Sequence, residues 1–433
     1  MISFILALFV IGFYFDFRKT FIILIVYSTL LMQFSVSISF MESLFYEVSA
    51  IGIFFFLLNQ EVYPFRDFPI KNSILLLIVS QLITFFFNPF SVGVIIRNLI
   101  LYADLFILYC LLRRQPNETL YFFFTNLLIF GTFIGLYGIY ETITESNPYM
   151  DFINHSKLYI RDFYIKEIRF GFKRSQTFFS MHTTNACVVM MISVALLCGK
   201  KFNTGLMRSI KFTVIFLCVG ILFLSGARSA MVGFVITFLA FTNPKSNTIR
   251  FAFPVIIIYI YFMNEVNDYF YEVLQSLVRT DYVAGSSSDM RNDQFRISNM
   301  LMMRSPIYGN GMGFTWSIVS KYNLMGAESI WFPLMIDQGF IGVISHLFFF
   351  SECAYYCYKN KMPSIIFVVL GFVVFNTLSS IPQFPSVFLF VYLLIIIESN
   401  KLYDRTHYKD RLQKIVDRLI KNERVVTLKD THF

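Results

Sequence analysis

The sequence predicts an all-α integral membrane protein, a polytopic bundle of about 12–13 transmembrane helices with two long outer-face loops that contain short amphipathic helices. Of 433 residues, 56% are hydrophobic and 19% are aromatic. Only 15% are charged, whereas soluble domains carry about 25% charged residues. Apolar runs of roughly 20 residues, the length that crosses a bilayer, recur from one end of the chain to the other.

The apolar runs define the predicted spans in chain order. The first run, 2–15, lacks the basic start and the small-residue cleavage site of a signal peptide, so we interpret it as a retained helix. All the spans belong to one membrane domain, 1–400, which is followed by a basic tail, 401–433. The predicted spans are 2–15, 21–40, 43–58, 73–88, 91–112, 119–141, 184–199, 211–226, 228–243, 250–264, 331–356, 363–379 and 384–398.

Lysine and arginine gather in alternate connections between the spans. The short connections on the other side, near 41–42, 88–91 and 381–386, contain none. Because basic residues collect on the cytoplasmic side of a membrane, the tail is predicted to be cytoplasmic and the amino terminus to lie outside. This distribution explains the net charge of +9 without a nucleic-acid partner. The basic residues of the cytoplasmic connections are Arg18, Lys19, Arg66, Lys71, Arg113, Arg114, Lys200, Lys201, Arg208, Lys211, Lys245, Arg250, Lys359 and Lys361.

The predicted outer face also carries basic residues. Two long loops, about 142–183 and 265–330, are rich in them, and Arg228 lies at the tip of a turn on the same side. Within the second loop, 290–304 has apolar residues at helical spacing, which predicts an amphipathic helix near the outer surface. Since arginine and lysine are normally sparse in short outer connections, their abundance indicates an anionic partner. The basic tail is expected to contact anionic membrane lipids on the cytoplasmic leaflet.

A few ionisable residues fall inside predicted spans. Arg97 lies about six residues from the outer end of its helix, and Asp104 follows two turns later on the same face. A charge at that depth must be paired or hydrated. Together with Glu47 and Asp337, these residues therefore predict either an outward-open polar cavity or an internal ion pair that locks helices together. His346 is expected to be a hydrogen-bonded core residue.

Short motifs give no support to metal or nucleotide chemistry. The sequence contains no HExxH, GxSxG, P-loop or GxGxxG stretch. The six cysteines lie in or at the ends of apolar runs without paired ligand spacing, and we interpret them as buried small hydrophobes. We therefore expect neither a metal nor a cofactor.

Arginine at the outer leaflet indicates a particular kind of chemistry. Its planar fork binds phosphate oxygens two at a time, which suits a lipid phosphate or pyrophosphate head group. Outside the membrane there is no nucleotide pool, so a transfer reaction there needs a lipid-carried, already activated donor, and a polyprenyl-pyrophosphate glycan meets this need. Departure of pyrophosphate requires charge stabilisation, and attack by a sugar hydroxyl requires one base.

Four stretches carry a family resemblance. FLSGARSAMVGF (223–234) places Arg228 in a turn after serine and glycine, and Arg291 is followed by RSPIYGNGMGF (304–314), with a proline and then Gly-x-Gly. GAESIWFPLMIDQGFIG (326–342) enters a helix and ends in a glycine turn, and RSQTFFSMHTTN (174–185) runs from an arginine to an asparagine before a helix. In their order and placement they resemble the O-antigen ligase and O-antigen polymerase superfamily, over about 90–400.

The resemblance implies a membrane glycosyltransferase, and a polysaccharide polymerase rather than a ligase. Ligases of this superfamily carry a histidine at the start of the third stretch, where this chain has Glu328. The resemblance therefore makes Glu328 the candidate base, with His182 as a rival that would restore the ligase function. It assigns Arg174, Arg228 and Arg291 to the donor pyrophosphate and Arg97 to the electrostatics of the cavity. Glu328 could also be a simple helix-start residue, stabilised near the positive helix end.

The predicted polymerase would join lipid-linked repeat units into O-antigen, capsule or exopolysaccharide on the outer face of the bacterial cytoplasmic membrane, with a chain-length regulator as a further partner. A ligase that delivers glycan to lipid A core or protein is the first alternative. The second is a flippase of lipid-linked oligosaccharide, which would need charged groups along the whole path and an internal repeat. The cytoplasmic halves of the predicted spans are largely apolar, and no repeat is visible.

Overall fold

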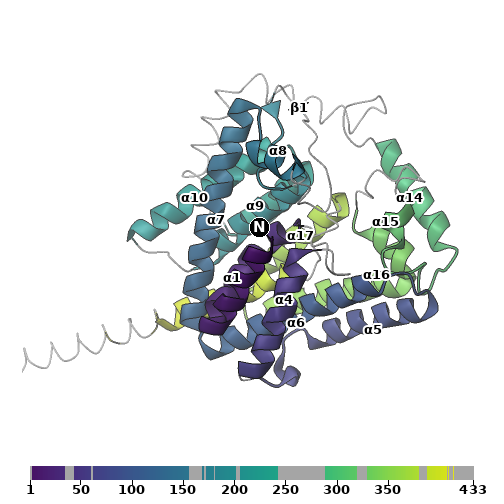
Figure 1. The fold of residues 1–433 in the computed structure, drawn as a ribbon, viewed down its shortest axis with the longest axis horizontal. Coiled ribbons are helices and arrows are strands. Elements are labelled where there is room, and N and C mark those ends of the chain that lie inside the picture. The colour runs from purple at the N-terminus through teal and green to yellow at the C-terminus, as the bar shows by residue number, and fades with distance from the viewer. Residues whose placement is uncertain are drawn as a thin grey trace, which may run out of the picture.

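A computed structural model describes residues 2–34, 43–59, 62–155, 168–169, 172–179, 181–200, 205–241, 288–318, 329–379 and 388–406, together with 408 and 413. These residues form an assembly of packed helices (Figure 1). The predicted span 250–264, much of both long loops and most of the tail lie outside the described residues.

Four of the described helices are long and apolar enough to cross a membrane. They are α6 (Val92–Arg114), α7 (Pro116–Thr144), α10 (Gly205–Leu224) and α16 (Trp331–Lys359). Shorter apolar helices accompany them, as the sequence predicts for an all-α membrane protein: α1 (Ile2–Phe15), α4 (Leu44–Asn59), α5 (Lys71–Phe87), α9 (His182–Cys198), α11 (Arg228–Phe241) and α17 (Ile366–Leu378).

The remaining elements are short and mostly connect the apolar helices. The two long connecting segments contribute α8 (Pro148–His155), a hairpin of β1 (Ile168–Arg169) and β2 (Phe172–Lys173), and the helices α14 (Ser288–Met302) and α15 (Phe314–Ile318). The turns η1 (Phe65–Asp67) and η2 (Pro363–Ile365) precede α5 and α17. A last helix covers 388–406.

The second predicted span, 21–40, is not one continuous helix. Its first part is α2 (Phe17–Val26), which is followed by the four-residue helix α3 (Ser28–Leu31). The Ser28 hydroxyl donates to the Ile25 carbonyl oxygen at 2.7 Å. This local bond satisfies one carbonyl oxygen at the end of α2. The apolar run alone does not reveal the interruption at Tyr27.

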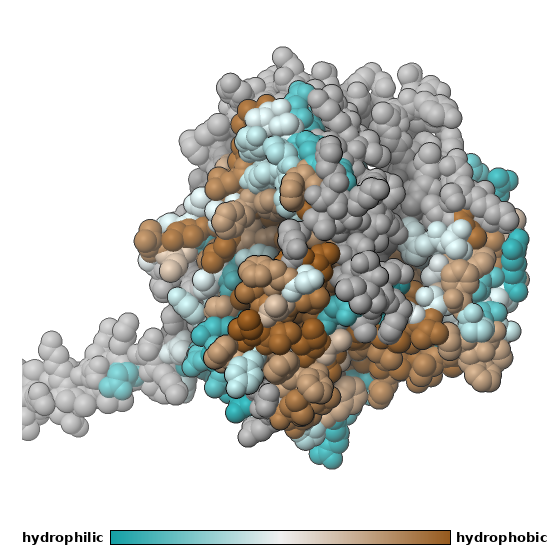
Figure 2. Space-filling view, viewed as in Figure 1, coloured by the Kyte–Doolittle hydropathy of each residue, from teal (hydrophilic) through white to brown (hydrophobic). Residues whose placement is uncertain are grey.

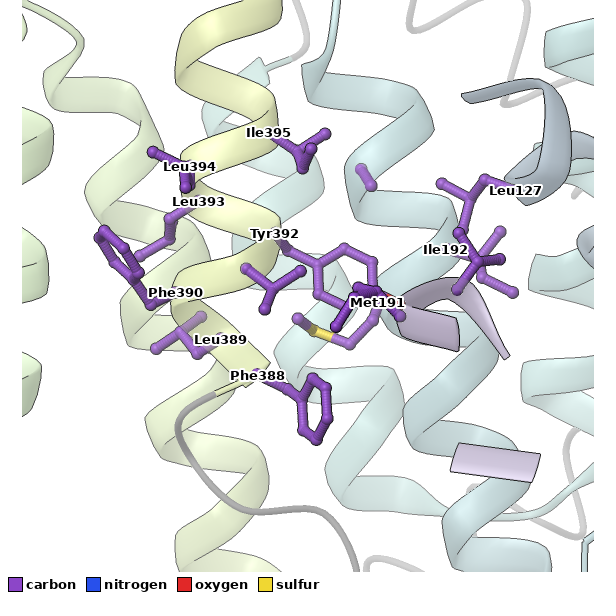
Figure 3. Packing of buried hydrophobic residues seen from close by; sticks show 14 of the residues in the cluster. Leu127, Met191, Ile192, Phe388, Leu389, Phe390, Tyr392, Leu393, Leu394 and Ile395 are labelled. Carbon is purple, nitrogen blue, oxygen red and sulfur yellow. The ribbon is translucent and has the colours of Figure 1, made fainter. Parts of the chain in front are cut away.

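The centre of the bundle is built around the helix 388–406. Figure 3 shows Leu389 and Phe390 on this helix, with Met191 and Ile192 of α9 and Leu127 of α7 across from it. Residues 388–397 are all buried, because other helices surround them on every side. Large apolar side chains instead lie exposed on the outer helices, and Figure 2 shows them as extensive brown surface. Such a surface is typical of helices that face lipid.

The six cysteines have the environments that the sequence predicts, because all six are free and buried. His346 is hydrogen-bonded as predicted, since its Nδ1 atom lies 2.9 Å from the Gly342 carbonyl oxygen within α16. The residue is only half-buried, so it does not lie in the core of the bundle.

Helices α11 and α17 cross at two glycines. A Cβ atom on Gly371 would lie 2.4 Å from the Gly233 carbonyl oxygen, and a Cβ on Gly233 would lie 2.6 Å from that of Gly371. The two backbones therefore touch, in the way that small residues permit between membrane helices. This crossing fixes the end of α17 against the start of α11.

The Gly371→Val substitution is expected to destabilise the protein by about 2–4 kcal/mol, because the side chain has nowhere to go except into the opposing backbone. The thermal unfolding midpoint of the purified protein in detergent would measure this. Gly220→Val on α10 is the matched control, since a Cβ there meets nothing within 4 Å. Equal midpoints for the two variants would contradict the close crossing.

Candidate functional site

The segment 173–177 positions the first of the predicted site arginines. It follows β2 and runs beside the turn between α10 and α11. The Arg174 Nε atom donates to the Ser225 carbonyl oxygen at 2.8 Å, and the Ser175 amide donates to the Leu224 carbonyl oxygen at 3.1 Å. Arg174 is only 6% exposed. Its guanidinium is thus held against the turn that leads into α11.

The same turn presents Arg228 as the first residue of α11. The Ser225 hydroxyl donates to the Leu222 carbonyl oxygen at 2.7 Å and accepts from the Ala227 amide at 3.4 Å. Gly226 has a φ of +63°, a conformation that favours glycine. Since the amino-terminal amides of a helix attract anions, Arg174, Arg228 and the start of α11 together form a positively charged corner. We call these three features the arginine corner.

A buried ion pair holds the segment in place. The Lys173 Nζ atom lies 3.2 Å from Glu141 Oε1, and both side chains are fully buried. Glu141 Oε2 also accepts the amides of Gln176 at 2.9 Å and Thr177 at 2.7 Å. A carboxylate with this many donors is well satisfied despite its burial. Glu141, near the end of α7, therefore orders the backbone that carries Arg174.

Two asparagines complete this network. Asn147 Nδ2 donates to Glu141 Oε1 at 2.9 Å and to the Thr177 carbonyl oxygen at 2.8 Å. Asn185 on α9 donates to the Ser175 carbonyl oxygen at 3.1 Å and accepts the Thr177 hydroxyl at 2.9 Å. We call Glu141, Lys173, Asn147 and Asn185 the clamp. His182, the rival base, is the first residue of α9 and lies one turn before Asn185, on the same side of the bundle as the clamp.

The end of α17 connects the arginine corner to the stretch that follows Glu328. The Ser229 and Ser379 hydroxyl oxygens are 2.5 Å apart. The Ile330 amide donates to the Asn376 carbonyl oxygen at 2.9 Å, and the Trp331 indole donates to the Thr377 hydroxyl at 2.9 Å. Glu328 itself lies outside the described residues, which resume at Ser329. Ile330 and Trp331, which follow the predicted base, therefore contact the carboxyl-terminal end of α17. Ser229, the residue after Arg228, contacts the same end of α17.

A second group of residues surrounds a break in α16. Gly339 has φ 63° and ψ −152°, so the long helix consists of two halves. Asp337 Oδ1 accepts the Thr315 amide at 2.7 Å and the Thr315 hydroxyl at 2.6 Å, and its Oδ2 accepts the Gly313 amide at 3.0 Å. Asp337 thus organises the loop before α15. It does not line an outward-open cavity, which corrects that part of the prediction.

Asp104 is likewise enclosed in the protein. It is 2% exposed, and the Ser49 hydroxyl lies 2.6 Å from each of its two oxygens. Arg97 lies on the same helix α6, one turn after Val94, which packs beside Gly313. This places Arg97 on the part of α6 that lies near the loop of the second group.

Residue 291 lies in the first turn of α14, and the structure does not describe its side chain. Helix α14 runs in the same direction as the first half of α16: the Phe295 and Phe332 rings are 6.5 Å apart, and Asn310 Nδ2 donates to the carbonyl oxygens of both Leu301 and Ile336. This register places the backbone of residue 291 about one turn before the level at which Phe295 meets Phe332. The start of α14 therefore lies near the entry into α16.

A helix, α14, covers most of the stretch 290–304 for which helical spacing predicts one, and polar side chains are among those it buries. Gln294 and Ser298 are buried together with Leu301, whereas Phe295 is 54% exposed. The two polar side chains face the body of the protein because α14 packs on α16, which offers polar as well as apolar groups.

Among the described residues, no group of three or more His, Cys, Asp or Glu side chains is arranged to hold a metal ion. The groups that the site offers to a ligand are guanidinium side chains, hydroxyls and backbone amides. These groups bind phosphate oxygens. The chemical character of the arginine corner is therefore that of an anion site.

Comparison with known proteins does not assign the chain to a family. No protein family model matches the sequence, and no curated protein matches it.

Proposed function

We propose that the protein is a polysaccharide polymerase of the bacterial cytoplasmic membrane, which joins polyprenyl-pyrophosphate-linked repeat units on the outer face. One observation carries this proposal: Arg174 and Arg228 lie on either side of one ordered turn, and a buried network holds that turn. An arginine pair of this kind suits the two phosphates of a pyrophosphate.

In the proposed reaction, a hydroxyl of the acceptor repeat unit attacks the anomeric carbon of the donor glycan. The bond from that carbon to the pyrophosphate oxygen breaks, and a glycosidic bond forms. Arg174, Arg228 and Arg291 stabilise the departing polyprenyl pyrophosphate, whose negative charge grows in the transition state. Glu328 takes the acceptor proton. Arg97 contributes positive potential from α6.

The register of α14 supports the role of Arg291. Residue 291 lies near the level where the chain enters α16, and this entry is bonded to the end of α17 beside Ser229. Glu328 lies outside the described residues, and its role rests on the sequence. Donor and acceptor groups would then meet between the arginine corner and the start of α16. A ligase remains the alternative, and one observation favours it: His182 begins the helix whose Asn185 belongs to the clamp.

The glycan profile of cells that lack the gene distinguishes these functions. Loss of a polymerase leaves single repeat units attached where long chains stood before. Loss of a ligase leaves long chains on the lipid carrier, and loss of a flippase removes lipid-linked units from the outer face. Of these results, single repeat units alone would support the proposal.

Glu328→Gln is expected to reduce polymer by about 100-fold or more, because glutamine keeps the size of the side chain but cannot accept the proton. Gel separation of surface glycan, with the protein level measured in parallel, checks this expectation. Asp151→Asn, an exposed change at the start of α8, is the matched control. If Glu328→Gln makes full-length polymer, the base must be sought elsewhere, starting with His182.

A further inference from the structure

Helices α5 and α16 pack side by side in opposite directions (Figure 1). The Ser73 amide donates to Glu352 Oε2 at 2.7 Å, and the Ser80 hydroxyl donates to the Ser345 hydroxyl at 3.3 Å. Between these contacts each helix advances seven residues, so the register is fixed. The polar contact at Ser73 also lies in the half of the bundle that the sequence predicts to be apolar and cytoplasmic. We call this line of contacts the seam.

Three oxygen atoms at the seam are buried and accept no hydrogen bond from any described residue: Gln81 Oε1, Thr84 Oγ1 and Gln338 Oε1. The exposed fractions of their side chains are 3%, 0% and 4%. A buried polar atom without a partner is costly, so native proteins normally supply one. The partner here must come from outside the chain that the structure describes.

The register places Gln81 and Gln338 each within about one turn of Thr84 along the two helices. Thr84 lies one turn beyond Ser80 on α5, which places it opposite residues 341–342 of α16. The Gln338 side chain lies against Gly342, since a Cβ atom built on Gly342 would be 3.2 Å from Gln338 Cδ. Gln81 precedes Thr84 by one turn, and its Nε2 donates to the Tyr102 hydroxyl at 2.7 Å, which fixes the amide.

The break in α16 makes this level electronegative. Gln338 is the last residue of the first half-helix before Gly339. The carboxyl end of a helix carries a partial negative charge, and in membrane proteins such half-helix ends are known cation ligands. A cation that is coordinated by oxygen atoms therefore suits this position better than a neutral molecule.

We propose that the seam binds a sodium ion through Gln81, Thr84 and Gln338. Hard cations take carboxylate, amide and hydroxyl oxygens as ligands, and a ring of neutral oxygens can replace the hydration shell of a monovalent ion. The ion links α5 to both halves of α16 at the break. This site goes beyond the proposed polymerase and shares no residue with the arginine corner, so its test does not depend on glycan chemistry.

Thermal unfolding of the purified full-length protein in detergent tests the proposal in sodium chloride, potassium chloride and choline chloride at equal ionic strength. An ion that binds only the folded state raises the midpoint in a saturable way. We expect sodium to raise it by roughly 3 °C over choline, and potassium by less. Equal midpoints in all three salts would overturn the proposal, as would a potassium effect equal to the sodium effect. This comparison needs only the wild-type protein.

Variants then locate the ion. Thr84→Val and Gln338→Leu remove one ligand oxygen each and are expected to abolish the sodium effect, whereas Thr84→Ser keeps the hydroxyl and the effect. Thr213→Val, an exposed change on α10, is the control, because its hydroxyl donates only to the Ser209 carbonyl oxygen among described groups. A sodium effect that survives in both Thr84→Val and Gln338→Leu would mean that the ion binds elsewhere, and that water fills the seam.

Discussion

Arg228→Ala is expected to abolish polymer growth while the protein stays folded in the membrane. Alanine removes a fixed positive charge from the start of α11, where the departing pyrophosphate is proposed to lie. Loss of one preorganised group that stabilises transition-state charge costs about 100–1,000-fold in rate, and a chain that grows by repeated transfer multiplies that loss. The length distribution of surface glycan measures the effect, with membrane-inserted protein quantified in the same cells.

The Arg228→Lys variant sharpens this test. Lysine keeps the charge but loses the planar fork, so it cannot bind two phosphate oxygens at once. We expect short chains from Arg228→Lys and single units from Arg228→Ala. Arg208→Ala is the matched control, because Arg208 is an exposed arginine on α10 at the opposite end of that helix from the arginine corner. Full-length polymer from a normally expressed Arg228→Ala protein would remove the basis of the proposed function.

Arg174 and Arg228 are expected to act as a unit. Groups that stabilise one transition state together are strongly non-additive when removed singly and in pairs. The double variant Arg174→Ala with Arg228→Ala should therefore lose little more activity than Arg228→Ala alone. A non-additive loss would indicate that Arg174 and Arg228 bind one pyrophosphate together. An additive loss would indicate that each arginine contributes to activity independently.

The turn around Arg228 could be predicted from the sequence because its signals are local. An apolar run ends, glycine permits a positive φ at Gly226, and a second run begins with Arg228. Most helices follow from apolar runs for the same reason, since burial and lipid exposure both select hydrophobic side chains. The interruption at Tyr27 is instructive, because hydropathy alone predicts a continuous helix there.

The clamp could not be predicted in this way. Lys173 and Glu141 are far apart in sequence, and each looked ordinary: a basic residue of a long loop and a glutamate at the edge of a span. Neither has a periodic partner that would reveal the pair. The signal that could have drawn attention was Glu141 itself, an acid at the end of a predicted span with Asn147 six residues later. Asp104 and Asp337 were noticed as ionisable groups, but their hydrogen-bond donors come from distant segments.

Glu141→Gln is expected to destabilise the protein by about 3–5 kcal/mol, because it removes the carboxylate charge that lies beside the buried Lys173 ammonium group. Glutamine retains the shape of the side chain, so the loss of folding stability measures the effect of the missing charge and not the effect of a cavity. The clamp also orders the segment that carries Arg174, and polymer should therefore shorten even at temperatures where Glu141→Gln remains folded. Thermal unfolding in detergent and glycan length together separate these two effects.

The double variant Glu141→Gln with Lys173→Met decides whether the clamp acts through charge balance. Removing both charges relieves the unpaired ammonium group, and replacement of a buried ion pair by neutral groups of similar volume is often close to neutral in stability. We expect the double variant to unfold at a higher temperature than Glu141→Gln alone, while polymer stays short, because methionine makes no hydrogen bond to the side chain at position 141 and the register of segment 173–177 loosens. If the double variant is less stable than either single variant, the pair does not balance charge, and the clamp works through the hydrogen bonds of Asn147 and Asn185 alone.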